Sequence, residues 1–377
     1  MAIFALLAAA PALAQDEAGP EHGIDWSVGL RGSYGANSLS GGRAELALTP
    51  EASLTLGGES SLGRISAGSD LVLDGAGQGR VADLHAAAEG SYRLGATTTL
   101  DGAVRAGLTQ ARPDASDLPA NTLTAPLVFD GTARGSVRQT LGKLVLTGTL
   151  DGQRRLKGET TLDDLSTIDN ADRSFWAGGA TLRVGYELTP LVTAFVEGEA
   201  SVRKFDAPDP GLARFLDGRI YQLRAGASYT QGASLAAEAA VGHAWIDYFD
   251  GTLTDRQSWV ANASVTVRPD ETVSLVGALE TTLGPSDSVA GDTDVRTALT
   301  GSARYRINPW LTLRGSGGWE QTVTLGTAAT SWRYEAGGGL DLQTARHVVW
   351  TADYLYSHDA PPASDTHMVS VGVRLQR

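Results

Sequence analysis

The chain ends in Met368-Val-Ser-Val-Gly-Val-Arg-Leu-Gln-Arg377, where apolar and polar residues alternate almost to the last position. Successive side chains of a β-strand point to opposite faces of its sheet. The apolar set therefore shares one face: Val369, Val371, Val373 and Leu375. A soluble sheet seldom finishes a chain on such a strand, whereas a closed barrel needs its last strand complete. The ending thus predicts a β-barrel.

The same period of two recurs along the chain in runs of about 9–11 residues, the length that a tilted membrane strand needs. Examples are Trp26/Val28/Leu30, Leu182/Val184/Tyr186/Leu188, Val192/Ala194/Val196, Tyr221/Leu223/Ala225, Trp259/Ala261/Ala263 and Leu299/Gly301/Ala303/Tyr305. After residue 14, no apolar run approaches the roughly 20 residues of a membrane-spanning helix. Only 42% of the residues are hydrophobic. This composition is typical of a barrel in which every second residue faces lipid.

Short and long connections alternate between these runs. Tight turns are expected at 94–96, 141–143, 188–191, 268–270 and 307–310. Longer acidic or Gly/Pro/Ser-rich segments are 111–122, 156–172, 206–217, 284–293 and 359–366. This asymmetry is typical of membrane barrels with short periplasmic turns and longer external loops. We predict an all-β, antiparallel, up-and-down barrel of about 18 strands, with 14 or 16 as alternatives because 36–62 and 111–130 are ambiguous.

The start of the chain predicts export. Residues 1–10 are mostly apolar, and Ala12 and Ala14 form the A-x-A pattern of a signal-peptide cleavage site, although no Lys or Arg precedes the run. We therefore expect a signal peptide at 1–14 and one outer-membrane barrel domain at 15–377. The absence of cysteine excludes disulfides and thiolate chemistry. The net charge of -13 disfavours nucleic acid as a partner.

Many charged residues fall on the polar side of the predicted strands. An arginine facing the middle of the lipid costs about 2–4 kcal/mol, so these side chains are expected to point into the barrel. The candidate pore-lining residues are Arg31, Arg183, Glu187, Glu197, Glu199, Arg203, Arg224, Glu280, Arg304, Arg306, Arg314, Glu320, Arg333 and Glu335. The same pattern adds Glu238, Asp341, Asp353 and Arg374. We expect a ladder between Arg304/Arg306 and Arg314/Glu320, and a transverse field across the pore. The alternative is a lumen filled by mutually neutralised ion pairs.

Large aromatic residues lie near the ends of the predicted strands. They are Phe175-Trp176, Tyr186, Tyr229, Trp245, Trp310, Trp319, Trp332 and Trp350. Such positions are typical of the aromatic girdles at the two membrane interfaces. The alternative is a sandwich core, which would place them in mid-strand.

Catalytic and metal-binding motifs are weak, and we predict neither an enzyme nor a bound cofactor or metal. The six histidines are scattered, without H-E-x-x-H spacing, and no G-x-S-x-G elbow is present. His243, followed by Asp247, is the nearest candidate for a site, but a polar girdle residue is the simpler reading. Asp163-Asp164, Asp169 and Asp172 could bind Ca²⁺, although their spacing does not match an EF-hand and favours a solvated loop.

Several strand-and-turn phrases resemble one known family. They are Asp169-Asn-Ala-Asp-Arg173, Arg183-Val-Gly-Tyr-Glu-Leu-Thr-Pro190, Phe195-Val-Glu-Gly198, Phe205-Asp-Ala-Pro208, Trp259–Thr272, Arg306-Ile-Asn-Pro-Trp-Leu-Thr-Leu313 and Gly372–Arg377. This pattern is similar to the beta-barrel porin 2 family of alphaproteobacterial outer membranes. The resemblance covers most of the chain and implies an outer-membrane barrel, without functional residues to carry over. Arg377 departs from the pattern, because barrels usually end in an aromatic residue that the insertion machinery reads.

Two functions are compatible with this sequence. The first is a passive, weakly selective diffusion pore for small hydrophilic solutes or ions. The second is a non-conducting structural or interaction barrel that binds surface polysaccharide or an assembly partner, which inward folding of 111–130 or 156–172 would favour. Expected partners are outer-membrane lipid and lipopolysaccharide, the insertion machinery and a possible second copy of the chain.

Overall fold

The computed structural model describes residues 23–38, 41–75, 77–115, 118–119, 121–286, 291–361 and 363–377. In this part of the chain an 18-stranded antiparallel sheet closes on itself, because β1 (Gly23–Asn37) pairs with both β2 (Gly41–Gly57) and β21 (Ser364–Gln376). The other barrel strands pair with their neighbours in chain order, so the barrel is up-and-down as predicted. The predicted signal peptide at 1–14 lies outside the described residues.

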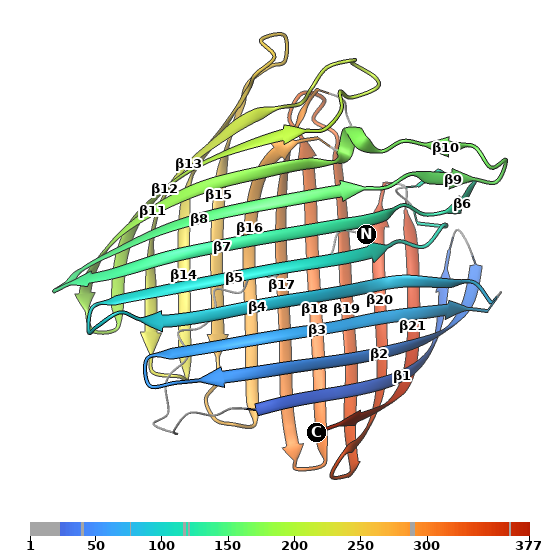
Figure 1. Ribbon diagram of the computed structural model, residues 1–377, viewed down its shortest axis with the longest axis horizontal. Helices are drawn as coiled ribbons and strands as arrows, with labels where there is room; N and C mark the ends of the chain where they lie inside the picture. Colours follow the sequence, from blue (N-terminus) through green and yellow to red (C-terminus); the bar gives the residue numbers. More distant parts are fainter. Residues whose placement is uncertain are drawn as a thin grey trace.

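The front and back walls of the barrel cross in Figure 1, as tilted strands must. The remaining barrel strands are β3 (Ser61–Asp74), β4 (Gly79–Arg93), β5 (Thr98–Gln110), β7 (Leu127–Leu141), β8 (Leu144–Lys157), β11 (Phe175–Thr189), β12 (Val192–Phe205), β13 (Gly218–Gln231), β14 (Leu235–Tyr248), β15 (Arg256–Val267), β16 (Val273–Pro285), β17 (Thr293–Asn308), β18 (Leu311–Thr324), β19 (Thr330–Ala345) and β20 (Val348–Ala360). No helix among the described residues is both long and apolar enough to cross a membrane.

The connections confirm the predicted asymmetry with one exception. All five predicted tight turns join neighbouring strands at one end of the barrel. At the other end, the long connections carry a small sheet of β6 (Thr122–Thr124), β9 (Thr160–Leu162) and β10 (Thr167–Ile168), followed by the 3-10 helix η1 (Ala171–Arg173). The predicted loop at 359–366 is wrong. β20 and β21 pair as far as Asp359 and Ser364, so the polar residues there belong to strands.

The two faces of the wall differ as the alternation predicts. Leu30 on β1 is 47% exposed and Val371 on β21 is 56% exposed, and the two belong to the same outward set of side chains. Exposed apolar side chains continue around the other strands. In a membrane barrel this face contacts lipid, and the opposite face points into the barrel.

One junction in the wall is incomplete. β15 and β16 pair only from Asn262–Glu280 to Val267–Leu275. Toward the long-loop end, Arg256–Ala261 of β15 pairs with β14 alone, and Thr281–Pro285 of β16 pairs with β17 alone. The wall therefore divides into two sheets over this external half of the junction.

The divided sheets overlap and enclose an apolar cluster. Ile246 (1% exposed) and Val260 (1% exposed) lie on the inward face of β14 and β15, whereas Leu283 (4% exposed) lies on the outward face of β16. Contact between these faces requires the β13–β15 sheet to lie outside β16–β17. The Tyr248 hydroxyl joins the layers, donating to the Asp292 carbonyl at 3.1 Å and lying 2.9 Å from the Thr293 hydroxyl.

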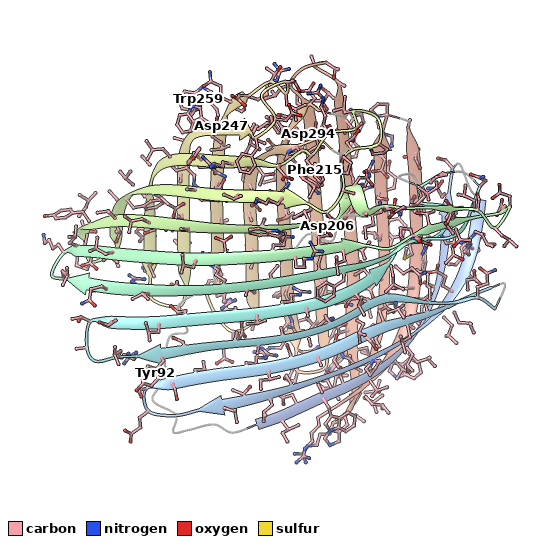
Figure 2. The ribbon with its side chains drawn as sticks, turned by 45° about the horizontal axis from the view of Figure 1, so that its top comes forward. Tyr92, Asp206, Phe215, Asp247, Trp259 and Asp294 are labelled. Atoms are coloured by element: carbon pink, nitrogen blue, oxygen red, sulfur yellow. The ribbon has the colours of Figure 1, made fainter. Side chains whose placement is uncertain are left out.

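Several of the predicted girdle residues lie where the prediction puts them. Trp176, Tyr186, Trp350 and Trp259 are exposed on the outward face, and Trp310 is exposed in the short turn between β17 and β18. Figure 2 shows Trp259 far from Tyr92, which lies at the end with the short turns. The assignment of Phe175 to the girdle is wrong. Neighbouring residues of a strand face opposite sides, and the outward position of Trp176 puts Phe175 (7% exposed) inside.

Candidate functional site: the charged inner face

The register of the strands places all fourteen candidate pore-lining residues on the inward face. They are distributed over β1, β11–β13 and β16–β19. Opposite charges on this face are brought together in separate clusters. Their role in lining a conducting pore stays a prediction.

The densest cluster spans β11–β14 around Glu197, which is 7% exposed. The Arg183 Nε donates to Glu197 at 2.6 Å, and the Arg224 guanidinium donates to the other Glu197 oxygen at 2.6 Å. Arg224 also reaches Glu199 at 3.1 Å. Arg183 makes a bidentate pair with Glu238 at 2.8 and 2.9 Å. Charge-assisted, bidentate bonds of this type hold guanidinium groups in fixed orientations.

Small residues allow this network to extend over several neighbouring strands of the inner face. Arg183 on β11 reaches Glu238 on β14 past the intervening β12 and β13. On β13, Gly226 faces inward beside this path, and a Cβ there would approach the Phe195 ring to 2.7 Å. The Phe195 ring itself lies 4.0 Å below the Arg183 guanidinium, a cation–π contact. A glycine is therefore required for the close packing beneath the ion pairs.

The opposite wall carries a second cluster. Arg314 on β18 pairs with Asp341 on β19 at 2.9 Å and with Asp353 on β20 at 2.8 Å. Gly339 lies on β19, opposite Arg314 on β18 and Asp353 on β20, and a Cβ there would collide with the Asp353 carboxylate. Arg31 on β1 pairs similarly across β2 with Asp70 on β3 at 2.9 Å. Both arginines therefore bind carboxylates two strands away.

The predicted ladder between β17 and β18 does not form. Arg304 lies directly opposite Arg314 in the register, and two like charges do not attract. Arg306 lies next to the short turn and pairs with Glu271 at 3.4 Å. Glu320 pairs instead with Arg296 at 2.6 Å. The error lay in the choice of arginine, because the register of this hairpin brings Arg296, and not Arg304 or Arg306, close to Glu320.

The remaining candidates are more dispersed. Arg203 lies 4.5 Å from the Phe175 ring, and Arg333 pairs with Asp359. Glu187 is close to the short turn between β11 and β12, and Glu280 lies opposite Asn262 at the last pair of the β15–β16 register. Glu335 lies on the inward row of β19, opposite Gly318 and Ser357.

The sequence analysis missed a further row on the inward face of β3–β8. The register aligns Arg64 with Glu89, Glu89 with Ala103, Ala103 with Arg134, and Arg134 with Asp151. The period of two was visible here as well, but small outward residues made these strands difficult to recognise. The row alternates in sign, as do the other clusters. Positive and negative groups are therefore not segregated to opposite walls, which argues against a simple transverse field.

The acidic loop between β8 and β11 uses its carboxylates to shape turns. Asp164 accepts hydrogen bonds from the Ser166 hydroxyl at 2.5 Å and the Ser166 amide at 3.0 Å, and these bonds hold the pKa of Asp164 below its usual value of 3.8. Asp169 accepts from the Ala171 amide at 2.9 Å. Among the described residues, no three His, Asp or Glu side chains form a group that could hold a metal ion.

His243 lies on the outward face of β14. Its ring is 4.7 Å from the Trp245 ring and 5.4 Å from the Trp259 ring. Asp247 also projects outward, toward the long-loop end of the same strand. This packing is typical of an aromatic girdle and offers no arrangement of a base beside a nucleophile.

The family model described as "Putative beta-barrel porin 2" matches residues 56–377. The chain belongs to this family. Its members are described as porins, which are transport channels of the outer membrane, and the closed barrel places this protein in the outer membrane as well. No curated protein shows significant sequence similarity to the chain.

Solved outer-membrane proteins have a similar fold. OpdO of Pseudomonas aeruginosa is 14% identical, with a TM-score of 0.45, over 94% of this chain and 97% of that one. OpdK of Pseudomonas aeruginosa is 10% identical, with a TM-score of 0.43, over 94% and 99%. OccAB4 of Acinetobacter baumannii is 9% identical, with a TM-score of 0.42, over 94% and 98%. At these identities the similarity concerns the fold alone.

Proposed function

We propose that this protein is a passive, weakly selective diffusion pore for small hydrophilic solutes or ions. The observation that carries the proposal is the closed 18-stranded wall with a charged inner face. Barrels of about 16–18 strands are too wide for side chains to fill and leave an aqueous channel. The ion pairs described on the inner face join nearby strands of the wall, such as β11 with β14 and β18 with β20, which supports charges that line a channel rather than bridge it.

The long connections are the part of the chain that would close the bore. In Figure 1, β6, β9 and β10 continue the wall beyond the ends of β5, β7 and β8. That placement supports an open pore over the alternative of a non-conducting barrel. The alternative requires these segments to fold across the mouth.

The charge of the long connections supports a preference for cations. Their described carboxylates greatly outnumber the arginines Arg112, Arg173 and Arg214. The carboxylates are Asp114, Glu159, Asp163, Asp164, Asp169, Asp172, Asp206, Asp209, Asp217, Asp250, Asp255 and Asp292. A mouth lined by one sign of charge concentrates counter-ions, and salt weakens the effect. We therefore expect cation selectivity that decreases as ionic strength rises.

The proposal is tested by single-channel recording of the refolded protein in a planar bilayer. Stable ohmic openings and a reversal potential on the cation side of a salt gradient are expected. Replacing Asp163 and Asp164 with asparagine should reduce the selectivity and leave the conductance at high salt unchanged. A folded, membrane-inserted barrel that carries no current would sink the pore proposal and favour the non-conducting alternative.

A further inference from the structure

On the barrel strands that the structure describes, the outward face carries basic side chains in one sector only. By register and alternation, the outward Lys and Arg residues of the described barrel strands are Arg154 on β8, Lys204 on β12 and Arg219 on β13. The other Lys and Arg residues of these strands face inward. An exposed cation on the lipid-facing side is costly unless it reaches the interface or a partner. The gathering of three such residues in one sector therefore requires an explanation.

The three cations form a patch near the long-loop end. Arg154, Trp176 and Lys204 occupy one register row across β8, β11 and β12. Arg219 lies on the next strand, opposite Val202, two residues from Lys204 along β12. We call these four residues the basic patch. Its aromatic member is exposed, as expected at a membrane interface.

The acidic neighbours leave part of this charge free. Asp206 binds Arg154 through two bonds of 2.8 and 2.5 Å, and this hydrogen bonding holds the pKa of Asp206 below its usual value. Asp247 lies opposite Arg219 in the register, and the Arg219 guanidinium lies 5.0 Å from the Phe249 ring. Lys204 makes no ion pair with any described residue. The patch thus keeps a net positive charge, with Arg154 held in a fixed orientation.

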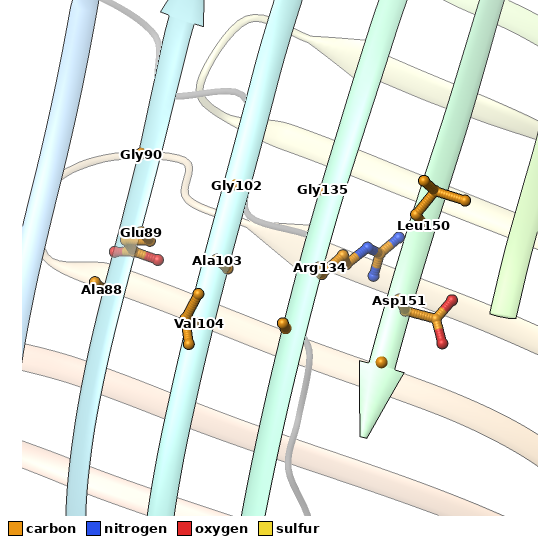
Figure 3. Close-up of a pocket in the computed structure, with 12 residues that line it drawn as sticks. Ala88, Glu89, Gly90, Gly102, Ala103, Val104, Arg134, Gly135, Leu150 and Asp151 are labelled. Carbon is orange, nitrogen blue, oxygen red and sulfur yellow. The ribbon is translucent and has the colours of Figure 1, made fainter. Parts of the chain in front are cut away.

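An apolar groove adjoins the patch on the same face. It has a volume of about 690 Å³, and its lining includes Leu150, Ala180, Leu182, Leu223 and Trp245. A second hollow shares Leu150 and continues across β4–β8. Figure 3 shows it, with glycines beside Val104 and Leu150.

The groove and the patch are aligned along the same strands. Leu150 and Arg154 are separated by four residues of β8, and Ala180 and Trp176 by four residues of β11. At about 3.3 Å per residue, the patch lies roughly 13 Å from the groove on its external side. An acyl chain in the groove would therefore have its head group beside the cations.

We propose that this sector is a specific binding site for a phosphate-bearing lipid of the outer leaflet. One acyl chain occupies the groove, and a head-group phosphate accepts hydrogen bonds from Lys204 and Arg219. The Trp176 ring packs beside the head group. This site lies on the outside of the wall and is independent of conduction through the bore.

The test is native mass spectrometry of the full-length barrel in detergent, titrated with diphosphorylated lipid A. The wild-type barrel retains one lipid at the lowest concentrations. The double variant Lys204→Gln/Arg219→Gln binds about 30-fold more weakly, since two cations next to an anionic lipid are lost. Leu182→Trp, which fills the groove and leaves the charges intact, also weakens binding. Arg304→Gln on the inward face is the matched control and binds as wild type does.

Several results would overturn the proposal. One is equal binding by the wild type and the double variant, and another is an equal loss in Arg304→Gln. Equal retention of dephosphorylated lipid A would remove the role of the phosphate. Displacement by inorganic phosphate would indicate a free-anion site, and a lipid-independent dimer lost in the double variant would indicate a second copy of the chain. Heat-modifiable migration on gels confirms that each variant is folded.

Discussion

The barrel is closed in two different ways at two of its junctions. β1 and β21, from opposite ends of the described chain, pair without interruption from Ser27–Gln376 to Asn37–Thr366. β15 and β16, which are sequence neighbours, pair only over their half nearest the short turn. Beyond that point, the wall is sealed by the buried side chains of the overlapping sheets.

The two junctions differ in the interactions that close them, which are backbone hydrogen bonds at one and buried apolar side chains at the other. Within lipid, unpaired backbone groups are expensive, so a complete ladder is the standard means of closure. At the β15–β16 junction, the buried apolar cluster around Ile246 and Val260 replaces the missing ladder. Local packing density therefore decides stability there, whereas backbone hydrogen bonding decides it between β1 and β21. The following predictions test this distinction.

The largest effect is expected for Ile246→Ala in the overlap. Removing a fully buried aliphatic side chain should lower the free energy of unfolding by about 2–5 kcal/mol. Val371→Ala on the outward face of the β1–β21 junction should cost much less, because lipid refills the space. Urea unfolding in lipid vesicles, followed by tryptophan fluorescence, measures both. Equal losses would show that the overlap is not a packed core.

A smaller loss is expected for Asp292→Ala. The Asp292 carboxylate accepts from the Gly326 amide at 3.0 Å and lies 3.6 Å from the Arg256 guanidinium, and the residue is 8% exposed. Removing a buried hydrogen-bonded charge while its partners remain should cost about 2 kcal/mol. Asp70→Ala, which frees the half-exposed Arg31 beside the other junction, should cost about 1 kcal/mol or less. The same unfolding assay measures both losses. A larger loss for Asp70→Ala than for Asp292→Ala would contradict the proposed difference between the two junctions.

Tyr248→Phe removes the hydroxyl that joins the two layers. The loss should be about 1 kcal/mol, the net value of a buried hydrogen bond, because the ring still fills its place. Tyr34→Phe on β1 is the control, since the Tyr34 side chain is 58% exposed. If both variants unfold like the wild type, the hydroxyl does not hold the layers together.

The smallest effect is a response to acid at the loop above the overlap. Asp250 accepts from the Thr252 hydroxyl at 2.7 Å, and this bond lowers the pKa of Asp250 below its usual value of 3.8. Its contribution to loop order is therefore present above that value and is lost as the pH falls through the lowered pKa. The protection factor of the Thr252 amide, which donates to Asp250 at 3.0 Å, should fall in acid before the barrel unfolds, when exchange is compared with the intrinsic rate at the same pH. Thr252→Val, which lacks the hydroxyl donor, should show the lower protection factor already at neutral pH.

The sequence predicted the inner face well because one rule decides it. A period of two, together with the cost of charge in lipid, assigns Arg183, Glu197 and Arg314 to the inside without knowledge of any contact. The same rule identifies Phe175 as inward once Trp176 is outward. The ion pairs could not be predicted in this way. Arg31 and Arg314 reach carboxylates two strands away, and such partners depend on stagger and on glycines in the intervening strand.

By itself, the sequence determined the class of fold, the outer-membrane setting, the positions of the tight turns and the inward side of the candidate pore-lining residues. These properties follow from local alternation and from the two solvents on either side of a thin wall. Only the tertiary structure decided the ion-pair partners, the overlap at β15–β16 and the alignment of Arg154, Lys204 and Arg219 above an apolar groove. These features depend on the relative register and curvature of neighbouring strands, which alternation within a single strand does not encode.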